Sequence, residues 1–163
     1  MVEEVKKEKK RKVLVTGSSG MLGSALCRRL SDAYDVSGLD VRRGDFFPTE
    51  QCDITNRAAT VDAITHIRPD VLIHAAAWTN VDKCEADPVR VRKINIDGTE
   101  NVALGAGRVN ATLFYVSTDF VFDGKSKAPY REEDVPFPLS VYARSKLEGE
   151  KKVKALKNYF ILR

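Results

Sequence analysis

The chain has 163 residues, of which 43% are hydrophobic and 31% charged, and its net charge is +4. This length and composition fit one globular domain and exclude a disordered or fibrous chain. The longest nearly apolar run, residues 71–78, is far shorter than the ~20 residues of a membrane helix, and the charged N-terminus lacks the apolar stretch of a signal peptide. We therefore expect a cytoplasmic protein that makes no membrane contact.

The positive charge is concentrated at the N-terminus. Residues 1–12 carry six lysines and arginines against three glutamates, so of the total of +4 only +1 remains for residues 13–163. We expect a charged flexible leader over 1–12, one domain over 13–163 and no nucleic acid partner. Cys27, Cys52 and Cys84 lack paired spacing and are expected as reduced apolar thiols, and these residues and the two histidines suggest no metal site.

From residue 13 onward, short runs rich in Val, Ile and Leu alternate with longer segments of helical period. This alternation predicts an α/β fold, a doubly wound parallel sheet (Rossmann) with strand order 3-2-1-4-5-6 and helices on both faces. The ligand crevice is expected at the carboxyl ends of strands one and four. The predicted strands cover residues 13–16, 35–40, 51–53, 71–74, 112–117 and 159–162, and the predicted helices cover 21–33, 57–67, 88–108 and 139–156.

A glycine-rich turn joins the first predicted strand to the first helix. Its glycines have the spacing G-x-x-G-x-x-G, in which one makes the turn, one admits a diphosphate to the backbone, and one lets the helix pack close to the strand. The helix N-terminus adds free N–H groups and a partial positive charge. An ordinary strand-to-helix turn is the alternative. The predicted dinucleotide contacts are Gly17, Ser18, Ser19, Gly20, Met21, Leu22 and Gly23.

Asp40 ends the second predicted strand, twenty residues beyond Gly20. A carboxylate at this place accepts hydrogen bonds from ribose hydroxyls, which favours NAD(H) as the cofactor. Arg42 and Arg43 follow at once and can meet a 2′-phosphate, so NADP(H) remains open. Ordinary solvated loop arginines are an equal interpretation.

Tyr142 and Lys146 are four residues apart in the predicted helix 139–156, so they share one helical face. We expect the ammonium to lower the pKa of the phenol from its usual ~10 toward the neutral range. Such a tyrosine exchanges a proton with a substrate oxygen. A tyrosine and a lysine at this spacing occur often by chance. The glycine turn upstream favours a catalytic role for this pair.

These features, together with Cys52-Asp53-Ile54, His74-Ala75-Ala76-Ala77, Asn95 and Ser117-Thr118-Asp119, resemble the extended short-chain dehydrogenase/reductase family over nearly all of the chain after the leader. Longer strings at 76–85, 117–124 and 130–142 resemble, within that family, the dTDP-4-dehydrorhamnose reductases.

The resemblance implies NAD(P)H-dependent reduction of the 4-keto group of a dTDP-deoxysugar, a sugar nucleotide, in dTDP-L-rhamnose biosynthesis. The implied catalytic residues are Thr118, Tyr142 and Lys146. The implied cofactor contacts, beyond those named above, are Asp53, Ile54, Ala75, Ala76, Ala77 and Ser117, with Asn95 as structural support of the site, and Tyr142 and Lys146 also hold the cofactor. The implied substrate contacts are Thr79, Val81, Asp82, Asp119 and Phe120.

Two alternatives remain open. A non-catalytic regulatory subunit of methionine adenosyltransferase shares the strings at 117–124 and 130–134, and a sugar-nucleotide epimerase or dehydratase uses the same Tyr142 and Lys146 with a tightly retained cofactor. The segment from Thr79 to Glu85 favours the reductase. Because related reductases continue beyond the length of this sequence, the resemblance implies that 13–163 is the cofactor-binding part of a longer protein, with little turnover by itself. It also implies a homodimer formed through the helices 88–108 and 139–156.

Overall fold

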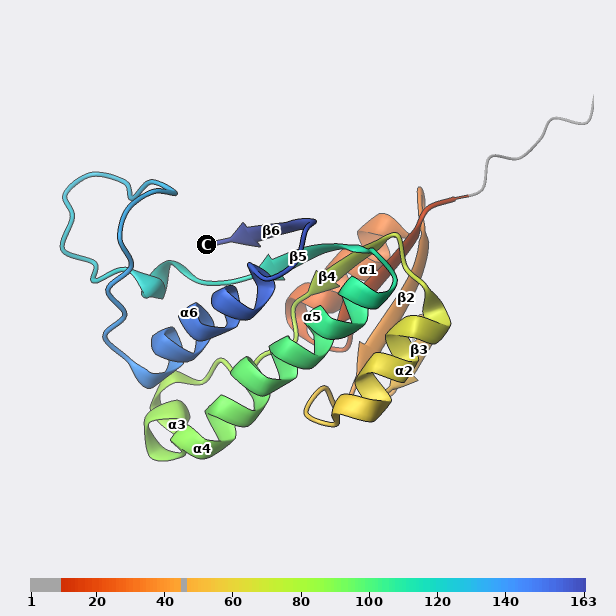
Figure 1. Cartoon of the computed structure of the whole chain (residues 1–163), viewed down its shortest axis with the longest axis horizontal. Helices are drawn as coiled ribbons and strands as arrows, with labels where there is room; N and C mark the ends of the chain where they lie inside the picture. Colours follow the sequence, from red (N-terminus) through yellow and green to blue (C-terminus); the bar gives the residue numbers. More distant parts are fainter. Residues whose placement is uncertain (1–9, 45–46) are drawn as a thin grey trace, which may run out of the picture.

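The structure, a computed structural model, describes residues 10–44 and 47–163. Six parallel strands form one sheet in the order β3-β2-β1-β4-β5-β6, which confirms the predicted order (Figure 1). The strands are β1 (Lys12–Thr16), β2 (Asp35–Asp40), β3 (Thr49–Gln51), β4 (Val71–His74), β5 (Thr112–Val116) and β6 (Tyr159–Leu162). Residues 1–9 of the predicted leader lie outside the described residues, and Lys12 already belongs to β1.

Helices lie between most of the successive strands. They are α1 (Met21–Leu30), α2 (Arg57–Ile67), α3 (Val81–Ala86), α4 (Pro88–Val91), the π-helical turn η1 (Arg92–Asp97), α5 (Gly98–Arg108), the 3-10 turn η2 (Asp119–Val121) and α6 (Val141–Val153). The predicted bounds of α2 are confirmed, whereas α1 and α6 are shorter than predicted. The prediction of strand residues at 52 and 53 is wrong, because β3 pairs with β2 only over Thr49–Gln51.

Two features of the helices were not predicted. The segment 88–108 is not one α-helix, because η1 inserts a π-helical turn between α4 and α5. The six-residue α3 begins where the Asn80 side chain accepts a hydrogen bond from the backbone N of Lys83 at 2.9 Å. A helix of that length has too few turns to show a periodic pattern.

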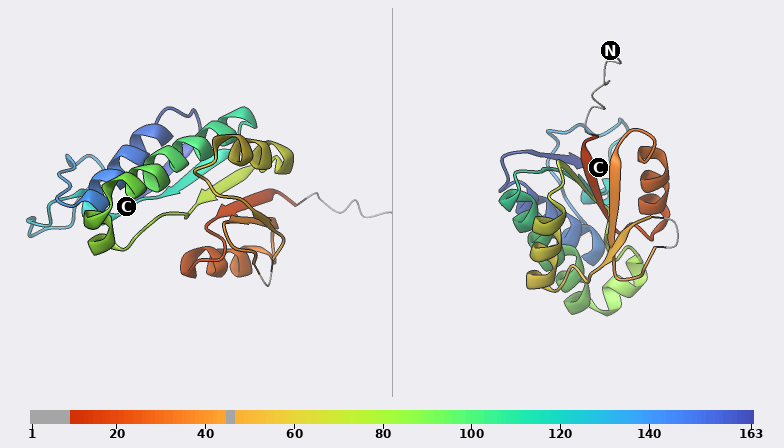
Figure 2. Two further views of the ribbon diagram at one scale, coloured as in Figure 1. Left: turned by 90° about the horizontal axis from the view of Figure 1, so that it is seen from below. Right: turned by 90° about the vertical axis from the view of Figure 1, so that its right-hand side faces the viewer.

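The helices cover the two faces of the sheet unequally (Figure 2). On one face α2, α5 and α6 enclose the larger core, in which Leu14, Leu72 and Leu113 of adjacent strands are fully buried. On the other face α1 packs against β1 and β2. Phe160, on that second face of β6, stacks on Phe114 at 4.7 Å between ring centroids and stays 54% exposed. Helices thus lie on both faces, as predicted, although Phe160 and Leu162 of β6 remain half-exposed on the second face.

The three cysteines are buried and free of disulfides, which confirms the expectation of reduced thiols in apolar surroundings. Within the described residues, no helix combines the length and the apolar character needed to cross a membrane.

Candidate functional site

Glycine is required at two positions here, one in the turn between β1 and α1 and one in the first turn of α1. Gly17 has a φ of +70°, and a Cβ there would lie 2.7 Å from the backbone N of Ala76. A Cβ on Gly23 would collide with the carbonyl oxygen of Gly17. The turn therefore lies directly against the segment after β4, and α1 starts close to β1. Gly20 closes the turn with a hydrogen bond from its N to the Gly17 oxygen at 3.0 Å.

A cleft of about 530 Å³ opens beside this turn, at the carboxyl ends of β1 and β4. The crevice is where the fold predicted it. Nine of the predicted cofactor residues meet in its wall: Gly17, Gly20, Asp40, Arg42, Asp53, Ile54, Ala75, Ala76 and Ala77.

Several residues of the cleft wall were not predicted from the sequence. Trp78, Arg90, Lys93 and Ile94 form part of the wall, and the Arg90 guanidinium lies 4.6 Å from the centroid of the Trp78 ring. These residues come from the loop after β4, from α4 and from η1. The motif spacings do not predict the π-helical turn η1.

Other predicted cofactor residues do not line the cleft. Ser18 is buried, and a Cβ on Gly38 of β2 would collide with its hydroxyl. Met21 is 92% exposed and Leu22 is also exposed, both in the first turn of α1. The Ser117 hydroxyl donates instead to Glu150 Oε1 at 2.6 Å, under α6.

Asp40 joins the glycine turn to the end of β2. Its Oδ2 accepts from the backbone N of Ser19 and its Oδ1 from the backbone N of Arg42, both at 3.0 Å. The Arg42 guanidinium lies 3.9 Å from Asp40 and donates to the Ser19 carbonyl at 3.0 Å. Each carboxylate oxygen keeps acceptor capacity, because it has a second lone pair. Asp40 thus stabilises the turn through these hydrogen bonds and can still accept one from a ligand hydroxyl.

Asn95, in η1, connects the cleft wall to α6. Its Oδ1 accepts from the backbone N of Trp78 at 2.8 Å, and its Nδ2 donates to the Trp78 carbonyl at 3.0 Å and to Ser145 Oγ at 2.9 Å. The side chain is 1% exposed. Its contacts are therefore with protein groups, and they fix the loop after β4 relative to α6.

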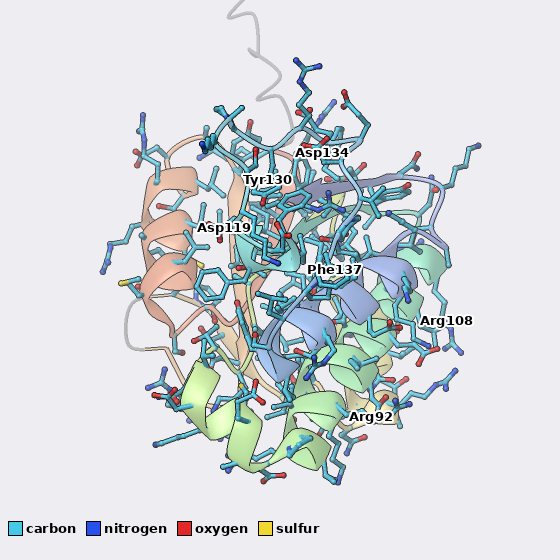
Figure 3. The ribbon with its side chains drawn as sticks, turned by 90° about the vertical axis from the view of Figure 1, so that its left-hand side faces the viewer. Arg92, Arg108, Asp119, Tyr130, Asp134 and Phe137 are labelled. Atoms are coloured by element: carbon cyan, nitrogen blue, oxygen red, sulfur yellow. The ribbon has the colours of Figure 1, made fainter. Side chains whose placement is uncertain are left out.

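Tyr142 lies at the start of α6 in an apolar cluster with Trp78 and Cys84. Burial raises the pKa of the Tyr142 phenol; the Thr118 hydroxyl against it opposes this rise, while Cys84 and Asp119 add to it. Thr118 Oγ1 also donates to Asp119 Oδ1 at 3.3 Å. Figure 3 looks onto the carboxyl ends of the strands, where Asp119 lies near the middle of the face.

Lys146 shares the face of α6 with Tyr142, but its amine contacts a different ring. The Nζ lies 4.1 Å from the centroid of Tyr115, a residue of β5, and the side chain is 2% exposed. Burial lowers the pKa of Lys146 to about 7, with the charge of Glu150 opposing it. The predicted lowering of the Tyr142 pKa by Lys146 is therefore wrong for this structure, because the amine is turned under the helix toward the sheet.

The predicted substrate residues divide into two groups. Val81 packs into the Tyr142 cluster, and the Phe120 ring meets that of Tyr142 edge-on at 6.3 Å between centroids, beside Asp119. Thr79 and Asp82 are exposed, and Asp82 lies in the first turn of α3.

Comparison with known proteins gives a family. Residues 11–163 match the family model described as the RmlD substrate binding domain. Over 142 residues the chain is 38% identical to dTDP-4-dehydrorhamnose reductase of Aggregatibacter actinomycetemcomitans, covering 86% of this chain and 46% of the relative. Over 155 residues it is 38% identical to methionine adenosyltransferase 2 subunit beta of Bos taurus, covering 94% and 46%.

A solved structure gives the same result. The crystal structure of dTDP-4-dehydrorhamnose reductase from Bacillus anthracis in complex with NADP superposes with a TM-score of 0.84 at 37% identity, covering 93% of this chain and 52% of that one. The chain spans about half the length of the curated relatives it matches. Since the family model covers nearly all of the sequence, the chain belongs to the RmlD substrate binding domain family.

Proposed function

We propose that this chain is the cofactor-binding part of an NAD(P)H-dependent reductase that acts on the 4-keto group of a dTDP-deoxysugar. One observation carries the proposal: Trp78 belongs both to the wall of the cleft and to the apolar cluster around Tyr142. The cleft and the candidate proton donor therefore share a wall. The relatives named dTDP-4-dehydrorhamnose reductase support the substrate class.

The residues of the cleft fit a dinucleotide. Gly17 and Gly23 keep side chains away from the turn, and the first turn of α1 offers N–H groups to a diphosphate. Asp40 and Arg42 both line the cleft. Asp40 would bind ribose hydroxyls and Arg42 would meet a 2′-phosphate, so both NADH and NADPH are candidates. Asp53 and Ile54 would contact the adenine. When bound, the reduced nicotinamide supplies the hydride.

The chain's own groups handle the proton. Because burial raises the pKa of Tyr142, the phenol is protonated at neutral pH, which suits a donor to the oxygen of a ketone under reduction. The Thr118 hydroxyl lies against that phenol and would hydrogen-bond the same oxygen. The Lys146 amine lies beneath α6 against the Tyr115 ring. Because burial lowers its pKa to about 7, the amine is only partly charged at neutral pH.

Replacing the phenol tests the proposal. In a protein that contains this chain, Tyr142→Phe should abolish reduction of the dTDP-4-keto sugar while leaving NADH and NADPH affinity, measured by calorimetric titration, close to wild type. Tyr34→Phe is the matched control, because Tyr34 is a half-exposed tyrosine outside the cleft wall. Undiminished turnover in Tyr142→Phe would refute the assignment.

A non-catalytic role is the second candidate. The match to methionine adenosyltransferase 2 subunit beta has the same 38% identity over a longer stretch, 155 residues. Co-purification with a methionine adenosyltransferase, together with dinucleotide binding but no sugar reduction, would favour this role. The homodimer through 88–108 and 139–156 also remains a proposal, which sedimentation velocity tests.

A further inference from the structure

The imidazole of His74 is buried at the end of β4, next to residues 75–77 of the cleft wall. It is 1% exposed, and its two ring nitrogens meet hydroxyls of two different elements. Nδ1 lies 2.6 Å from Thr16 Oγ1 of β1, and Nε2 lies 3.0 Å from Thr99 Oγ1 of α5. The ring thus joins the central strand to a helix, and the proton transfer described above does not use it.

The neighbours of the ring decide which nitrogen carries the proton. Burial lowers the pKa of His74 to about 3, so the ring holds a single proton at neutral pH. Thr99 Oγ1 donates its one proton to the Asn95 carbonyl at 2.7 Å, so it accepts from Nε2. With the proton on Nδ1 instead, the Asn95 carbonyl would face a lone pair of Thr99. The Tyr115 phenol also lies against the Thr99 hydroxyl, but it donates to a different backbone carbonyl, at 3.3 Å.

The second ring nitrogen extends the series toward the glycine turn. Because Nδ1 is bare, Thr16 Oγ1 donates to it. The same oxygen accepts from the backbone N of Ala76 at 3.4 Å, the atom that a Cβ on Gly17 would strike. The hydrogen bonds therefore run in one direction through a single series of residues: Ala76, Thr16, His74, Thr99 and Asn95.

The other end of the series lies in the π-helical turn η1. Turns of this kind are rare and are frequent at functional sites. The Asn95 carbonyl that accepts from Thr99 belongs to this turn, and the Asn95 side chain bonds both polar groups of the Trp78 backbone. The Thr99 hydroxyl therefore ties to β4 the same residue that holds Trp78 in the cleft wall.

We propose that His74, with its proton on Nε2, is a positioning residue that couples the glycine turn on one side of the cleft to Asn95 and Trp78 on the other. The inference rests on the proposed function only for its effect on dinucleotide affinity. The place of the proton and the position of Trp78 are properties of the chain without any ligand.

The place of the proton is tested directly by NMR. The chain is labelled with ¹⁵N in its two histidines, His66 and His74, and His66→Gln identifies the two sets of ring signals. A protonated and a bare ring nitrogen differ strongly in ¹⁵N chemical shift, so the spectrum at neutral pH shows which nitrogen of His74 holds the proton. We expect the proton on Nε2. His66, exposed on α2, provides the reference ring.

Coupling along the series is tested by removing one hydroxyl. Thr99→Val keeps nearly the same shape and removes the acceptor of His74. It should shift the fluorescence emission of Trp78, the one tryptophan of the sequence, and weaken NADH binding roughly fivefold, the equivalent of one hydrogen bond. Thr99→Ser restores the hydroxyl and should restore both. Thr65→Val is the matched control, since Thr65 bonds a carbonyl of its own helix at 3.0 Å, outside the cleft wall.

Each outcome decides. A proton on Nδ1 of His74 in the wild type would overturn the proposal. So would a Thr99→Val variant, folded by circular dichroism, whose Trp78 emission and NADH affinity match those of Thr65→Val, since a merely structural role lowers stability without moving either. If Thr99→Val does not fold, Thr16→Val breaks the series on the β1 side and takes its place, with the same expected shifts. A wild-type chain that binds no NADH would count against the proposed function, while the proton position and the Trp78 emission would still decide this inference.

Discussion

Truncation of Asn95 is the most direct test of how the cleft wall is held. Asn95→Ala removes three hydrogen bonds, two to the backbone of Trp78 and one to Ser145, with lengths of 2.8 to 3.0 Å. At a net contribution of ~1 kcal/mol for each bond, the free energy of unfolding should fall by ~3 kcal/mol. For a chain of this size, the melting temperature should fall by roughly 6–12 °C.

Asn101→Ala is the matched control. Asn101 is a buried asparagine in the neighbouring helix α5, and its Nδ2 makes one hydrogen bond, to the carbonyl of Ile54 at 2.9 Å. Its truncation should cost ~1 kcal/mol. Urea unfolding with linear extrapolation measures both values. If Asn95→Ala costs no more than Asn101→Ala, the reasoning that Asn95 anchors the cleft wall is refuted.

The remaining predictions concern the glycine turn and acid stability. Gly23→Ala should lower dinucleotide affinity and stability, because its Cβ strikes the Gly17 carbonyl. Gly107→Ala, on the exposed side of α5, meets only the end of the Leu156 side chain at 3.1 Å and should cost much less; calorimetry and urea unfolding compare the two variants. His74 has a folded pKa of about 3, lowered by burial and then by Lys146, against an ordinary value near 6.5 in the unfolded chain. The unfolded state then binds the proton first, so stability is lost as pH falls from about 6.5 toward 3. In His74→Gln, the free energy of unfolding measured with urea should fall less over this pH range than in the wild type. An equal fall in both proteins would contradict this prediction.

Much of the fold follows from local sequence pattern. The six strands are short apolar runs between turn residues, and the handedness of parallel crossovers leaves few arrangements for such a series. The π-helical turn in 88–108 was not predictable in this way, since the segment keeps a helical composition throughout. Short α3 depends on one cap at Asn80 and on packing against α6 rather than on its own periodicity.

The site was predictable where a motif is contiguous and less so where distant segments meet. The glycine turn follows from its own spacing. The direction of the Lys146 side chain does not, because four residues of helix fix only the face. The ring that Lys146 contacts belongs to Tyr115, a residue 31 positions earlier in the chain. Likewise Glu150 gains its partner Arg163 only when β6 joins the sheet.

The arrangement of the sheet has a consequence for how the chain folds. The central strand β1 joins β2 on one side and β4 on the other, and the hydrogen-bonded pair Thr16 and His74 across the second junction is separated by 58 positions. The walls of the cleft come from both sides of this junction. Closing so long a loop is slow compared with forming local helices. The crevice therefore cannot exist before its two halves dock, and in refolding experiments nucleotide uptake should emerge after most of the helical signal.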